Sequence, residues 1–156
     1  MFSKIGGKER ATHFAVGDLR DGKLVDYRVC CPEHGPDFYA PQTFWDGQRR
    51  IMIGWLYHWG KELPEGRDYA GAFAIPRELR LEDGRVCSFP VREARGLLGK
   101  TSAFVSCDGD TVTVNNGRRD IISIQTPWNE MDILEDTYSV EVFLDRGKTS
   151  LSCRLD

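Results

Sequence analysis

The stretch from Phe38 to Tyr57, FYAPQTFWDGQRRIMIGWLY, decides the fold class of this sequence. It begins with an aromatic run over Phe38–Trp45, passes through Asp46-Gly47-Gln48, and continues as an apolar run over Arg50–Tyr57. Asp-Gly between two strand-like runs is a strong hairpin signal, because glycine readily adopts the positive φ that tight turns require. The stretch therefore predicts two antiparallel strands.

The same pattern of short strands and glycine turns continues on both sides of this hairpin. The sequence holds 16 glycines and 7 prolines, many of them between short apolar runs, and no convincing helix is longer than a turn or two. We therefore predict an all-β fold built of propeller blades or a sandwich. The further expected strands are Thr12–Gly17, Leu24–Cys31, Ala72–Ile75, Leu79–Leu81, Arg85–Phe89, Ala103–Cys107, Thr111–Asn115, Asp120–Gln125, Ser139–Leu144 and Thr149–Leu155. Glu93–Lys100 reads as a connection between two parts.

Composition excludes several classes of protein. The chain has 156 residues, of which 40% are hydrophobic and 29% charged, and its net charge is −3. The apolar fraction is too high for a disordered chain, and the charge balance does not favour a nucleic-acid partner. No apolar run is long enough to span a membrane, and the first residues, MFSKIGGKER, show no apolar signal region. We therefore expect no membrane partner and a cytoplasmic location.

The cysteines and histidines give no sign of a metal site, a cofactor site or a nucleophile. The five cysteines form no C-x-x-C pair, so we expect reduced thiols that are mostly small core residues. No G-x-S-x-G elbow, P-loop or dinucleotide fingerprint is present. His13, His34 and His58 are expected at the surface or at strand ends.

The densest cluster of polar and aromatic side chains runs from Glu33 to Trp59. Aromatic rings beside carboxylates and amides suit a sugar, because the ring packs on the C–H face while polar groups fix the hydroxyls. Composition alone favours the alternative, in which these aromatics fill a β core. Glycoside hydrolysis needs two converging carboxyl groups, and the spacing of Glu33, Asp37 and Asp46 does not show that any two converge. Glu33 and Asp46 are expected to be surface carboxylates in turns.

Four ordered segments resemble glycoside hydrolase family 32, the family of invertases, sucrose-6-phosphate hydrolases, inulinases and levanases. The first, GPDFYAPQTF, resembles the family's D-F-Y-A-x-Q-T-F segment, and the second, RRIMIGWL with Trp59, its R-R-I-x-I-G-W-M-x-x-W strand. Ala70-Gly71 with Pro76–Leu79 resembles its A-G-x-x-x-x-P-R-E-L segment, and Ser139–Leu144 with Gly147 resembles its S-x-E-V-F-x-x-x-G pattern. Together the four segments cover most of the chain.

The resemblance implies the late blades of a five-bladed β-propeller followed by a β-sandwich. Residues 1–92 would form the partial propeller with its linker, and residues 93–156 a partial sandwich. The 56 residues that follow Lys100 in this 156-residue chain allow about six strands at 5–6 residues each. A sandwich of two full sheets needs more, so we expect a shortened one.

The resemblance also implies β-fructofuranosidase chemistry on sucrose or fructans, a retaining reaction that uses two carboxyl groups. The family's nucleophile, stabiliser and acid/base motifs, W-M-N-D-P-N-G, R-D-P and E-C, are absent from this sequence. No catalytic residue is therefore assigned, and the chain is expected to be inactive alone. The candidate residues for binding a fructose-containing saccharide are Trp55, Trp59, Asp37 and Tyr39. Trp55 is the first choice, whereas Asp37 is expected to support the pocket.

Two alternative functions remain open. One is a non-catalytic carbohydrate-binding or interaction module, and the other is a degenerate remnant without activity. Open strand edges invite pairing with another chain. We therefore expect either self-association or a complementing chain that carries the early blades.

Overall fold

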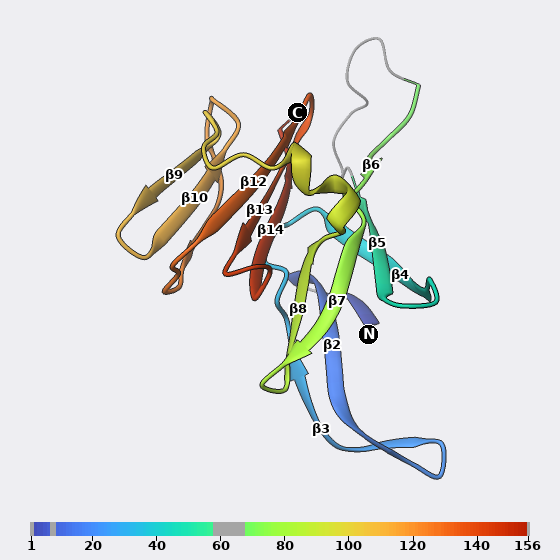
Figure 1. Ribbon diagram of the computed structural model, residues 1–156. Coiled ribbons are helices and arrows are strands. Elements are labelled where there is room, and N and C mark those ends of the chain that lie inside the picture. Colours follow the sequence, from blue (N-terminus) through green and yellow to red (C-terminus); the bar gives the residue numbers. More distant parts are fainter. Residues whose placement is uncertain (1, 7–8, 58–67, 156) are drawn as a thin grey trace.

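The computed structural model describes residues 2–6, 9–57 and 68–155 (Figure 1). Nearly every regular element in this part of the chain is a β-strand, and a single 3₁₀ helix, η1 (Arg92–Leu97), is the exception. The prediction of an all-β fold is thus confirmed. No helix within these described residues is long and apolar enough to span a bilayer.

Two sheets make up the first part of the chain. The first has the order β1-β2-β3 and the second β4-β5-β7-β8, with β6 paired to β5. The predicted hairpin is confirmed, since Trp45 pairs with Arg50 across the Asp-Gly turn. Phe14, Phe38 and Met52 bury their side chains where the two sheets meet. The strands are β1 (Phe2–Gly6), β2 (Glu9–Arg20), β3 (Lys23–Cys30), β4 (Phe38–Trp45), β5 (Arg50–Leu56), β6 (Ala72–Phe73), β7 (Arg77–Glu82) and β8 (Arg85–Pro90).

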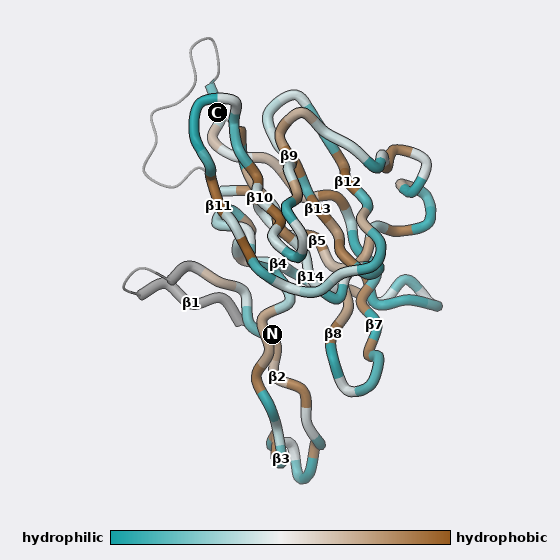
Figure 2. Tube along the Cα trace, turned by 90° about the vertical axis from the view of Figure 1, so that its left-hand side faces the viewer, coloured by the Kyte–Doolittle hydropathy of each residue, from teal (hydrophilic) through white to brown (hydrophobic). Residues whose placement is uncertain are grey.

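Two three-stranded sheets make up the second part, in the orders β11-β10-β9 and β12-β13-β14. They share one hydrophobic core, to which β10 contributes Val112 and Val114 and β13 contributes Val140 and Val142. Figure 2 shows hydrophobic residues along these strands. Burying each such side chain stabilises the fold by about 1.5–3 kcal/mol. The strands are β9 (Val105–Asp108), β10 (Thr111–Asn115), β11 (Asp120–Gln125), β12 (Met131–Asp136), β13 (Ser139–Leu144) and β14 (Thr149–Arg154).

Two strands lie outside the sequence-based prediction. β1 is one of them, and β12, with the sequence MDILED, is the other. β12 lies at the edge of its sheet, where Ile133 is its one fully buried residue. An edge strand needs few apolar residues and tolerates charge, so its hydrophobic pattern is too weak to read from sequence.

Backbone hydrogen bonds join the two parts of the chain along a seam. The Ser150 N–H donates to the Pro32 carbonyl and the His34 N–H to the Ser150 carbonyl, both at 2.8 Å, and the Ser88 N–H donates to the Gly147 carbonyl at 2.9 Å. Gly35 lies so close to β14 that a Cβ atom there would overlap the backbone of Ser152. The second part is therefore packed directly against the first.

Candidate functional site

A row of aromatic side chains crosses the sheet at the end of β5. Trp55 pairs with Tyr39 of β4 on one side and with Phe73 of β6 on the other. Directly opposite residues on neighbouring strands project from the same face of a sheet. Tyr57 extends the row, with its ring centroid 4.2 Å from that of Trp55. We call Tyr39, Trp55, Tyr57 and Phe73 the aromatic row.

The aromatic row is part of the surface rather than of the core. Phe73 is 82% exposed, and Tyr39, Trp55 and Tyr57 are half-buried. The opposite face of β5 carries Met52 and Leu56, which are buried. The row can therefore present ring faces to a ligand without opening the core.

Gly71 leaves the space that the indole of Trp55 occupies. Its φ is +81°, and a Cβ atom at this position would overlap the Trp55 indole and the Leu56 carbonyl oxygen. Only glycine meets both requirements without strain. The Ala70-Gly71 segment thus shapes the site through the backbone.

The four candidate binding residues are not all brought together. Tyr39 and Trp55 are neighbours in the aromatic row. Asp37 is buried, and its Oδ2 accepts a hydrogen bond from the backbone N–H of Arg154 at 2.8 Å. Its carboxylate is thus directed into the seam. Trp59 lies outside the described residues, as does His58.

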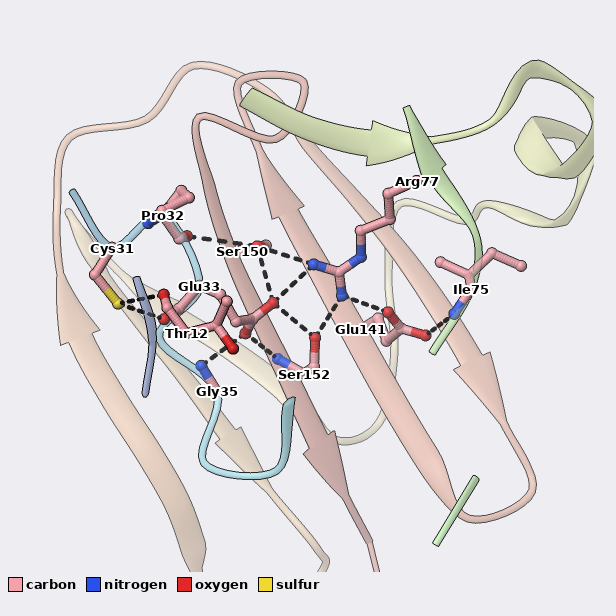
Figure 3. Close-up of polar contacts among 10 residues, drawn as sticks. All are labelled: Thr12, Cys31, Pro32, Glu33, Gly35, Ile75, Arg77, Glu141, Ser150 and Ser152. Carbon is pink, nitrogen blue, oxygen red and sulfur yellow. Dashed lines mark hydrogen bonds and ion pairs between the residues drawn. The ribbon is translucent and has the colours of Figure 1, made fainter. Parts of the chain in front are cut away.

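A buried ion network crosses the seam (Figure 3). Arg77 of β7 donates from Nη1 to Glu33 Oε2 at 2.7 Å and from Nη2 to Glu141 of β13, and both carboxylates are almost fully buried. The Arg77 guanidinium also lies between the rings of Phe38 and Phe143, 4.6 and 4.8 Å from their centroids. The network joins both parts of the chain.

Hydroxyl groups and backbone N–H groups donate the other hydrogen bonds that the Glu33 carboxylate oxygens accept. Oε2 accepts from Ser150 Oγ at 3.0 Å and from Ser152 Oγ at 2.9 Å. Oε1 accepts from the N–H groups of Gly35 at 2.8 Å and Ser152 at 2.9 Å. The expectation that Glu33 is a surface carboxylate is therefore wrong, because the sequence does not reveal its distant partners. The same expectation for Asp46 is confirmed.

Burial and pairing act in opposite directions on the charges of this network. Burial alone lowers the pKa of Arg77, but the carboxylates of Glu141 and Glu33 outweigh it and raise the pKa above its ordinary value. Burial raises the pKa of Glu141, and Arg77 offsets only part of that effect. Arg77 thus remains charged, and its charge compensates the carboxylates.

The cysteines and histidines differ in part from expectation. All five cysteines are free, but only Cys87 and Cys153 are buried, so the prediction of mostly core cysteines is wrong. The prediction failed because the sequence around each cysteine does not show which face of its strand is packed against another sheet. His34 is exposed, as predicted, and His13 is half-buried. No group of three or more metal-ligating side chains occurs within the described ranges.

Comparison with known proteins identifies relatives of this chain. The model of the "Glycosyl hydrolases family 32 N-terminal domain" matches residues 2–90. Raffinose invertase of Escherichia coli is 30% identical over 113 residues, which are 70% of this chain and 24% of that protein. Sucrose-6-phosphate hydrolase of Vibrio alginolyticus is 41% identical over 102 residues, which are 58% of this chain and 20% of that protein. The chain thus spans about a quarter or less of the length of these relatives.

Solved structures show the same fold. A family 32 β-fructofuranosidase of Bombyx mori, in complex with sucrose, superposes with a TM-score of 0.74 at 19% identity, covering 94% of this chain and 42% of that one. The sucrose-6-phosphate hydrolase of Lactobacillus gasseri gives a TM-score of 0.71 at 16% identity, with 93% and 43% covered. At this identity the likeness concerns the fold. The match of the family model over more than half of the sequence shows that the chain belongs to glycoside hydrolase family 32.

Proposed function

We propose that this chain is the C-terminal part of a β-fructofuranosidase-like hydrolase that cleaves sucrose or fructans. Residues 1–92 would form the last propeller blades and residues 93–156 a partial sandwich. Three observations support the proposal: the family match ends at residue 90, a relative is named raffinose invertase, and the Bombyx mori neighbour was solved with sucrose.

The aromatic row is the observation that carries the proposal. Tyr39, Trp55 and Phe73 offer adjacent rings across the sheet at the end of β5. Such rings pack against the C–H faces of a sugar and exclude water from that side. In the proposal the row forms one wall of the site that holds a fructose-containing saccharide.

Hydrolysis needs two free carboxyl groups on either side of the glycosidic bond. The buried carboxylates among the described residues already make contacts in the seam: Glu33 and Glu141 with Arg77, and Asp37 with the Arg154 N–H. We therefore propose that the nucleophile and the acid/base residue belong to sequence outside this stretch. A complementing chain with the early blades would supply them.

The second candidate is a non-catalytic carbohydrate-binding module. The exposure of Phe73, at 82%, favours it, because a ring so open can contact a sugar without the other blades. This candidate needs the same aromatic row but no carboxyl pair. Both candidate functions therefore require saccharide binding by the aromatic row, and only the hydrolase also requires turnover.

Sucrose titration followed by NMR of the tryptophan indole N–H groups tests the shared claim. The Trp55 signal is expected to shift when sucrose is added. The signals of the second part of the chain are expected to stay unchanged. Trp55→Ala should abolish binding, whereas Trp45→Ala should retain it, since Trp45 is an exposed tryptophan at the opposite end of the same hairpin. An unchanged Trp55 signal at saturating sucrose would overturn the proposal. Sedimentation of the same samples reports self-association.

A further inference from the structure

A pocket of about 250 Å³ opens along the seam between β3, β8 and the start of β14. Cys30, Pro32 and Val86 contribute its uncharged wall, and Arg28, Arg85 and Lys148 contribute three cations. No carboxylate lines the pocket among the described residues. We call it the basic pocket.

The cations of the basic pocket are not used in ion pairs. Arg28 donates only to the backbone carbonyl of Asp83, at 3.3 Å, and no ion pair within 4.0 Å forms at Arg85 or Lys148 among the described residues. The nearby Glu82 is paired with Arg80 at 3.3 Å. Three uncompensated cations in a chain of net charge −3 create a local positive field.

The backbone around the basic pocket is held in place before any ligand binds. Lys148 follows Gly147, whose carbonyl accepts from the Ser88 N–H at 2.9 Å. Arg28 is tied to the turn between β7 and β8 through Asp83. Figure 1 shows this turn near β3, whereas β6, which pairs with Trp55, lies at the other end of the sheet. The basic pocket is therefore separate from the aromatic row.

We propose that the basic pocket binds a phosphate group, either as free phosphate or as the phosphate ester of a small molecule. Arginine presents a planar fork that matches two phosphate oxygens, and lysine adds a compact charge. A volume of about 250 Å³ has room for a phosphate with a small organic group. The uncharged wall suits that organic group. This site does not depend on the proposed hydrolase function.

Isothermal titration calorimetry of the 156-residue chain at pH 8 tests the proposal. The probes are inorganic phosphate and glucose 6-phosphate, with glucose as the uncharged reference. Arg85→Gln and Lys148→Gln should each weaken binding about tenfold, as expected for the loss of one charge-assisted hydrogen bond. Arg118→Gln is the matched control, since Arg118 is an exposed arginine in a turn of the other part of the chain. Melting temperatures of all variants should agree within a few degrees.

The result separates the two sources of phosphate. Tighter binding of glucose 6-phosphate assigns the pocket to a phosphate ester, and equal binding of both probes assigns it to the phosphate group alone. Binding of neither probe overturns the proposal. It is equally overturned if Arg118→Gln weakens binding as much as Lys148→Gln, because the effect would then be one of net charge. Nothing in these outcomes tests the aromatic row.

Discussion

Replacing Arg77 with methionine would leave two buried carboxylates without their cation. Arg77 is fully buried and donates to Glu33, Glu141, Ser150 and Ser152. Methionine preserves much of the side-chain volume between the neighbouring rings, so the change mainly removes charge and hydrogen bonds. Arg77→Met therefore isolates the electrostatic contribution of the network.

The expected loss is large for a single substitution. Removing one partner of a buried ion pair costs about 3–5 kcal/mol, because the other charge stays buried and uncompensated. For a chain of this size, 1 kcal/mol shifts the melting temperature by about 2–4 °C. Arg77→Met should therefore lower it by about 6–20 °C. Ser152→Ala removes one hydroxyl of the same network and should cost about 1–3 kcal/mol.

Urea unfolding followed by tryptophan fluorescence measures these losses. Arg92→Met is the matched control, because the Arg92–Glu93 pair has side chains 64% and 55% exposed. Exposed pairs contribute about 0–1 kcal/mol. The reasoning is refuted if Arg77→Met unfolds within about 1 kcal/mol of the unsubstituted chain. If Arg77→Met does not fold, Ser152→Ala carries the test, and an unchanged stability there refutes it.

Two further predictions concern the surface of the first part. Gly71→Ala should lower the free energy of unfolding by more than about 1 kcal/mol, because the φ of residue 71 is +81° and the added Cβ would displace the Trp55 indole. The near-ultraviolet circular dichroism spectrum should change as well, and an unaltered spectrum argues against this packing. Hydrogen bonds from Arg49 lower the pKa of Glu93 from 4.5 to about 2, so this carboxylate stabilises the fold above pH 4.5 and the contribution is lost as the pH falls toward 2. Glu93→Gln should reduce the dependence of the melting temperature on pH over that range. An unchanged pH dependence contradicts the pairing of Glu93 with Arg49.

Local pattern was sufficient for most strands. The predicted strand Phe38–Trp45 coincides with β4, an aromatic run that ends at a glycine turn, and Thr111–Asn115 coincides with β10, whose residues alternate between half-buried and buried. Among the described residues, six strands follow Lys100, β9 to β14, and all of them except β12 correspond to strands expected from the sequence. The edge strand β12 was missed because its burial depends on one residue, Ile133.

The ion network could not be derived from local pattern. Glu33 and Arg77 are 44 residues apart, and Arg77 and Glu141 are 64 apart. Arg77 and Glu141 both lie in segments that resemble family 32 motifs, but a motif does not show that they pair. Phe73 was missed in the aromatic row because the pairing of β6 with β5 follows a long connection.

Fructose release from sucrose and inulin by the purified 156-residue chain tests the central claim most directly. The buried carboxylates Glu33, Asp37 and Glu141 make contacts across the seam, and in the proposed function the catalytic carboxyl groups come from sequence outside this stretch. The account predicts no release by the chain above the rate without protein. Clear release that is lost in Asp37→Asn or Glu33→Gln, with folding retained, would contradict it.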